Sequence, residues 1–129
     1  MEAKLNIAPN QSEKCSVLVI AGHKDLRSGL ATLLRSLPQI GHIYFSDTDH
    51  EAEAIIEAYP IRLAILDQEH LGNNLPRLSA KLKSKRVSVI TLGDWDGGNE
   101  KDSESGNYVM KGVRPEKLML EIQKKCREL

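Results

Sequence analysis

The sequence predicts a doubly wound α/β domain built on a five-stranded parallel sheet. Apolar runs of strand length alternate along the chain with segments whose apolar residues follow helical spacing. This alternation favours a parallel sheet that is covered by helices on both faces. The length of 129 residues is that of one domain.

Five short runs are expected to form the strands, and the first of them is a β-branched apolar run of the kind found in buried parallel strands. In chain order they are residues 16–20 (SVLVI), 40–45 (IGHIYF), 62–67 (RLAILD), 87–93 (VSVITLG) and 107–111 (NYVMK). Continuous apolar runs are typical of strands that have helices on both sides.

Four segments show the apolar spacing of helices. We expect Asp25 to cap the first, which ends before Pro38. The second follows cap candidates that include Thr48, the third lies within residues 73–85, and Pro115 opens the last. These helices supply the connections that a parallel sheet requires.

The segment between the fourth and fifth strands breaks this pattern. Residues 94–106 contain three glycines and one hydrophobic residue, Trp95. Glycine disfavours a helix, and no amphipathic face compensates for it, so we expect the fourth helix to be short or missing. The polar N-terminus is expected to be a flexible tail over residues 1–14, followed by the domain over residues 15–129.

Composition excludes several classes of function. Lys plus Arg and Asp plus Glu each number 18, and this zero net charge does not indicate nucleic-acid binding by the domain. No apolar run approaches the length of a membrane span, so no membrane association is expected. Cys15 and Cys126 lack metal-ligand spacing and fit two reduced thiols of a cytoplasmic protein.

Polar residues follow the strands at the edge where an open parallel sheet binds its ligands. Asp67 ends the third strand, Thr91 lies in the fourth, and Lys111 follows the fifth. A carboxylate, a hydroxyl and an ammonium that converge on one edge suit the handling of a phosphoryl group. Ala21 and Gly22 follow the first strand at the same edge.

The chain resembles the receiver domains of bacterial response regulators, of the type found before helix-turn-helix output domains. The resemblance rests on the runs VLVIAGHKDLRSGLATLLRSLP, LAILD, VITLG and YVMKGVRPEKLMLEI, in this order and spacing. It implies a flavodoxin-like fold with strand order 2-1-3-4-5. It also implies that Asp67 is the phosphoacceptor equivalent, that Thr91 and Tyr108 hold the switch positions, and that Lys111 holds the lysine position.

The main departure from the family lies at its metal site. The acidic pair that binds Mg²⁺ in receivers falls on Ala21 and Gly22, so these are vacated metal-site positions. Mg²⁺ requires oxygen ligands, and we therefore expect its binding to be weak or absent, with no other cofactor. Glu69 is a possible partial substitute, and His23 is a poor ligand for this hard cation.

These observations predict a pseudo-receiver, a non-enzymatic module of cytoplasmic signal transduction that binds a protein partner. The resemblance implies a link to transcription, and a homodimer through the fifth strand and last helix is one possible arrangement. Two alternatives stay open: a true phosphoacceptor that is modified on Asp67, and a small-molecule-binding module of flavodoxin-like fold. A structural ion pair with Lys111 is a simpler explanation of why an aspartate, Asp67, ends the third strand.

Overall fold

The computed structural model describes residues 14–93, 108–110 and 114–127. Three sequence predictions therefore fall outside the described residues: the tail, except for Lys14, the segment 94–106 with Trp95, and the position of Lys111.

Five parallel strands form one sheet in the order β2-β1-β3-β4-β5. Their bounds are β1 Cys15–Ile20, β2 Ile40–Ser46, β3 Leu63–Asp67, β4 Ser88–Gly93 and β5 Tyr108–Met110. The predicted sheet and its strand order are confirmed. Every strand begins and ends within one residue of its predicted range.

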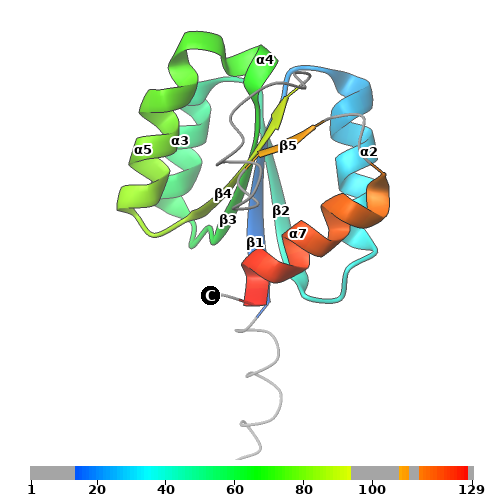
Figure 1. Ribbon diagram of the computed structural model, residues 1–129. Coiled ribbons are helices and arrows are strands. Elements are labelled where there is room, and N and C mark those ends of the chain that lie inside the picture. Colours follow the sequence, from blue (N-terminus) through cyan, green and yellow to red (C-terminus); the bar gives the residue numbers. More distant parts are fainter. Residues whose placement is uncertain (1–13, 94–107, 111–113, 128–129) are drawn as a thin grey trace, which may run out of the picture.

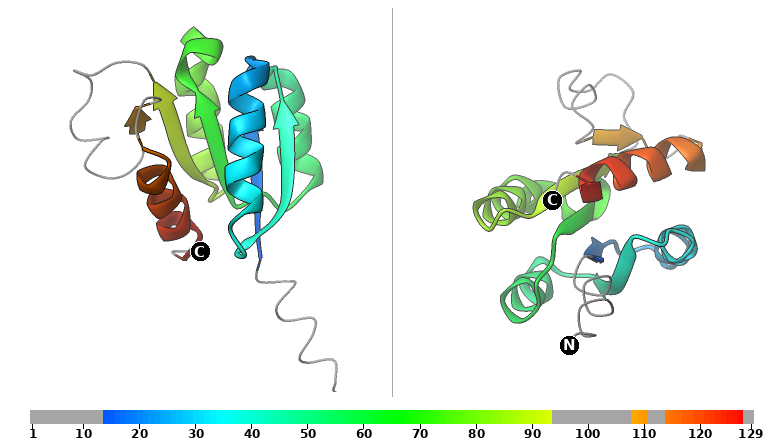
Figure 2. Two further views of the ribbon diagram at one scale, coloured as in Figure 1. Left: turned by 90° about the vertical axis from the view of Figure 1, so that its right-hand side faces the viewer. Right: turned by 90° about the horizontal axis from the view of Figure 1, so that it is seen from below.

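Four longer helices cover the sheet, two on each face (Figure 1). They are α2 Lys24–Arg35, α3 Asp49–Ala58, α5 Leu75–Ser84 and α7 Pro115–Arg127. Helices α2 and α7 lie on one face, and α3 and α5 lie on the other; Figure 2 shows the same layers from two further directions. Two short helices follow β3: α4 Gln68–Leu71, which the sequence did not predict, and the 3-10 turn η1 Gly72–Asn74, which overlaps the start of the predicted third helix.

The predicted cap of the first helix is wrong by two residues. The N-cap is His23, whose side chain makes no capping hydrogen bond, while its carbonyl accepts the amide hydrogen of Arg27 at 3.0 Å. Asp25 lies inside the first turn, where a negative charge is favourable beside the positive end of the helix dipole. The cap at Thr48 is confirmed, because its side chain accepts from the amide of Glu51 at 3.0 Å.

The sheet separates two apolar layers. The layer beneath α2 and α7 includes Val17, Val19, Leu34, Ile65, Ile90 and Ile122. The layer beneath α3 and α5 includes Leu18, Ile20, Ala64, Leu66, Leu78 and Leu82. Alternate residues of β1 and β3 enter opposite layers, as the two-residue period of a strand requires.

Cys15 and Cys126 belong to the layer beneath α2 and α7. Both are free thiols; Cys15 is buried and Cys126 is half-buried. A hydrogen bond with Cys126, together with burial, raises the pKa of the Cys15 thiol. Cys15 therefore remains a neutral core side chain at physiological pH.

Opposite charges join α3 to α5 on the outer side of the other layer. Arg77 pairs with Asp49 and, at 2.7 Å, with Glu53. Lys81 contacts Glu53 at 3.3 Å, and Lys85 contacts Glu57 at 2.9 Å. The hydrogen bond from Arg77 and that from Lys81 lower the pKa of Glu53.

We expect this ion-pair network to make stability depend on pH. A carboxyl group whose pKa is lowered by folding stabilises the folded state above its unfolded pKa of about 4.3, and the contribution is lost as the pH falls through the folded pKa. Glu53→Gln should therefore lower the melting temperature at pH 7, and the difference from wild type should shrink as the pH falls through the lowered pKa of Glu53. Glu51→Gln on the same helix is the control, and an equal loss in both variants would contradict the prediction.

Candidate functional site

The candidate site is centred on Asp67, a carboxylate at the end of a fully buried strand. Only 2% of the residue is exposed. Its Oδ1 accepts the amide hydrogen of Glu69 at 3.2 Å, so Asp67 also caps the short helix α4. The apolar run LAILD fixes the strand, and aspartate is a favoured residue at the start of a helix. The side chain is thus held at the carboxyl edge of the sheet.

A cavity of about 400 Å³ opens beside this carboxylate. It is lined by Gly22 and His23 from the turn after β1, and by Asp67, Glu69 and His70 from the end of β3 and from α4. The ends of two adjacent strands therefore meet at one cavity, as expected for the carboxyl edge of a parallel sheet. The predicted metal-site position Gly22 and the predicted phosphoacceptor position Asp67 belong to the same site.

His70 occupies one side of this cavity, and its role was not predicted. Its Nε2 donates to the main-chain carbonyl of Asp47 at 2.5 Å. Its ring also lies directly against Gly22, because a Cβ atom at position 22 would overlap Nδ1 and Cε1 of the imidazole. The space that a side chain at position 22 would need is therefore filled by His70.

The other position at which the resemblance places a metal ligand, Ala21, lies in a different environment from Gly22. Ala21 is 1% exposed and belongs to the apolar layer beneath α2 and α7. Its amide donates to the carbonyl of Ser46 at 3.2 Å, which joins the turn after β1 to the end of β2. A carboxylate at position 21 would be buried, and it would need a cation or hydrogen-bond donors to be stable there.

Thr91 and Tyr108 lie on the next strands along the same edge. Thr91 is half-buried and in register with Leu66 and Tyr108, but it is not among the residues that line the cavity. The Tyr108 hydroxyl donates to Oε1 of Gln68 at 3.3 Å, which connects β5 to α4. Its hydroxyl lies over Gly93, where a Cβ atom would overlap it. Lys111 lies outside the described residues.

Gly93→Ala is expected to displace the Tyr108 side chain, because the added methyl group and the hydroxyl cannot share one position. NMR signals of the Tyr108 ring and the Gln68 side-chain amide should both shift. Gly29→Ala in α2 is the matched control: no atom lies within 4 Å of its Cβ position, and a glycine inside a helix costs about 1 kcal/mol relative to alanine. The control should stabilise the fold and leave Tyr108 unchanged; an unshifted Tyr108 in Gly93→Ala would contradict the described geometry.

The described residues contain neither a cluster of three metal ligands nor a helix that could span a membrane. Among the described residues, no three His, Cys, Asp or Glu side chains are arranged so that they could ligate one metal ion. None of the helices in the described ranges has the length and apolar character needed to cross a membrane.

Comparison with known proteins identifies the fold. No protein-family model matches the chain, and no curated protein matches it. Solved structures do match. The signal receiver domain of an HD domain-containing protein from Pseudomonas fluorescens Pf-5 has a TM-score of 0.73 and 17% identity, over 89% of this chain and 96% of the other.

Two other solved structures agree with this result. A response regulator from Thermotoga maritima has a TM-score of 0.72 and 15% identity, over 88% of this chain and 98% of the other. A DNA-binding response regulator of the LuxR family from Staphylococcus aureus has a TM-score of 0.71 and 22% identity, over 87% and 98%. The chain therefore has the fold of response regulator receiver domains.

Proposed function

We propose that the chain is a pseudo-receiver: a receiver-fold domain of signal transduction that acts by binding a protein partner, without Mg²⁺-dependent phosphorylation of Asp67. One observation carries this proposal. The imidazole of His70 lies against Gly22, on the side of the cavity where the resemblance places an acidic metal ligand. An aromatic ring that is held by a hydrogen bond to Asp47 replaces a carboxylate there.

The donor groups at the site fit Mg²⁺ poorly: Glu69 adds a second carboxylate to the cavity lining, but no three potential ligands among the described residues are arranged around one point. This ion prefers near-octahedral oxygen coordination and is usually held by one or two carboxylates together with water and phosphate oxygens. Asp67 is a buried carboxylate that already accepts a hydrogen bond from the amide of Glu69. Ala21 and Gly22 supply no side-chain oxygen, and an imidazole suits zinc or copper better than magnesium.

The missing carboxylates also bear on phosphoryl transfer. Transfer to a carboxylate brings two anions together, and catalysts of this reaction neutralise the charge with metal ions and cationic side chains. We therefore propose that Asp67 is a structural residue that caps α4, rather than an acceptor. The domain would not be an enzyme, and its output would come from its surface.

We also propose a cellular role and a partner surface for the domain. Receiver-fold neighbours include a DNA-binding response regulator, which supports a role in cytoplasmic signalling linked to transcription. A protein partner or a second copy could use β5 and α7. On this helix Leu120 is 60% exposed and offers apolar area to such a contact.

Beryllofluoride, a mimic of the phosphoryl group on aspartate, tests the proposal. The full chain is titrated with beryllofluoride and Mg²⁺, and the amide NMR signals of Asp67, Thr91 and Tyr108 are followed. We expect no shift in the wild type, whereas a conventional receiver domain in the same buffer responds. Saturable shifts that vanish in Asp67→Ala would overturn the proposal and establish the alternative, a true phosphoacceptor.

A further inference from the structure

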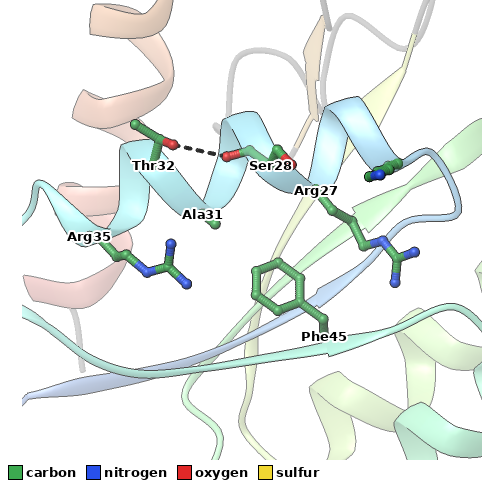
Figure 3. A pocket seen from close by; sticks show the side chains of 7 residues that line it. Arg27, Ser28, Ala31, Thr32, Arg35 and Phe45 are labelled. Carbon is green, nitrogen blue, oxygen red and sulfur yellow. Dashed lines mark hydrogen bonds between the residues drawn. The ribbon is translucent and has the colours of Figure 1, made fainter.

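A groove of about 450 Å³ lies between α2 and the edge strand β2, away from the Asp67 cavity. Six of its lining residues come from α2 and one, Phe45, comes from β2 (Figure 3). The α2 residues are Lys24, Arg27, Ser28, Ala31, Thr32 and Arg35. No part of the proposed pseudo-receiver function uses this groove.

No acidic residue in the described part of the chain pairs with the positive charges of this groove. Among the described residues, Lys24, Arg27 and Arg35 make no ion pair, and Asp25 is the one acidic residue of α2. Arg77 and Lys81 of α5 differ, because they pair with acidic residues of α3. The α2 cations therefore remain available to an external anion.

An apolar surface separates these charges. The half-buried ring of Phe45 lies between the guanidinium groups of Arg27 and Arg35, and Ala31 faces the ring from the helix (Figure 3). The Thr32 hydroxyl donates to the carbonyl of Ser28 at 3.1 Å, so it is used within the helix. The groove thus offers cation, apolar ring and cation in one line.

The groove is too open for a small ligand. A pocket that binds a drug-sized molecule usually buries most of its surface. Here four of the lining residues, Lys24, Ser28, Thr32 and Arg35, are exposed to solvent. An elongated, open, cationic surface with an apolar centre suits a segment of polypeptide that lies along the helix.

We propose that this groove binds an extended acidic segment of a protein partner, with the pattern acidic–x–apolar–x–acidic. Arg27 and Arg35 are eight residues apart, which is about 12 Å along a helix at 1.5 Å per residue. Two residues four positions apart in an extended chain are separated by about 13 Å and point to the same side. The residue midway between them points to that side also, and it meets Phe45.

The segment then makes three contacts: a carboxylate at Arg27, an apolar side chain on Phe45 and a carboxylate at Arg35. Lys24, about one helical turn before Arg27, extends the attraction to a further acidic residue. Exposed ion pairs are individually weak, so the apolar contact and the spacing provide selectivity, and salt should weaken binding. The groove does not include Asp67, so binding of the acidic segment does not depend on whether that residue is phosphorylated.

The test uses a fluorescein-labelled peptide with the core Glu-Thr-Leu-Thr-Glu and the full-length chain. Fluorescence anisotropy measures affinity, and amide NMR signals of Ser28, Ala31 and Phe45 locate the contact. We expect saturable binding that Arg27→Glu with Arg35→Glu weakens by about tenfold. Phe45→Ala should weaken it as well, and a Lys-Thr-Leu-Thr-Lys peptide should bind the charge-reversed variant better than the wild type.

Lys83→Glu with Lys124→Glu is the matched control, because it reverses two exposed charges elsewhere and should leave binding unchanged. Asp67→Ala should also leave it unchanged, which separates this proposal from the proposed function. Each of the following results would overturn the proposal: no NMR shift at millimolar peptide, equal loss in the control variant, or equal binding of the reordered core Glu-Glu-Thr-Leu-Thr. Equal competition by a nucleoside triphosphate would also overturn it, since the groove would then recognise anions in general.

Discussion

Leu34→Ala is expected to lower the free energy of unfolding by about 3 kcal/mol. Leu34 lies in α2, is 0% exposed and packs in the layer between that helix and the sheet. Truncation removes buried apolar area and leaves a cavity, because strands β1 and β3 beneath it are themselves fully packed and cannot move to fill it. The melting temperature should fall by about 10 °C.

Denaturant unfolding followed by circular dichroism measures this change. Leu120→Ala is the control, because the same substitution at a 60% exposed position of α7 should cost less than about 0.5 kcal/mol. The difference between the two variants reports the burial of Leu34 alone, since the chemistry of the substitution is identical. Equal losses would show that α2 does not pack on the sheet as described.

The strands were predictable because burial on both faces leaves a local signature in sequence. The first four residues of β3 form one buried apolar run that Asp67 ends, and such a run is typical of a strand with helices on both faces. The start of α2 was less predictable: both His23 and Asp25 can stand near a helix N-terminus, and the choice depends on main-chain geometry. Short turns such as α4 have too few residues to show a period.

The candidate site was predictable only in part, for a related reason. Gly22 and Asp67 line one cavity because the carboxyl ends of neighbouring parallel strands lie at the same edge of the sheet. Knowing where the two strands end in the sequence was therefore enough to predict that these residues meet. The position of His70 depends on tertiary contacts with Gly22 and Asp47, which no local pattern encodes. In the same way, spacing places Arg27 and Arg35 on one side of α2, but only the structure shows that no acidic residue of the described ranges pairs with them there.

A Mg²⁺ site is expected to appear when three positions are changed together: Ala21→Asp, Gly22→Asp and His70→Ala. The two aspartates restore the acidic pair beside Asp67, and the third change removes the ring that a side chain at position 22 would overlap. Without metal, the variant should be less stable than the wild type, because a carboxylate at the 1% exposed position 21 is desolvated and repelled by Asp67. Mg²⁺ should then restore stability, by about 1.4 kcal/mol at a concentration ten times its dissociation constant.

Thermal unfolding at increasing Mg²⁺ measures this effect, and the wild type should show no dependence beyond that of a matched ionic strength. Ala21→Asp with Gly22→Asp alone should bind Mg²⁺ about tenfold more weakly than the triple variant, since the new side chain at position 22 must compete with the His70 ring for the same space. Adding Asp67→Asn to the triple variant should abolish the response, which places the metal at that carboxylate. If the triple variant gains no Mg²⁺ dependence, the cavity differs from that of a receiver by more than these three side chains. The position of the His70 ring would then not explain weak Mg²⁺ binding by the wild type.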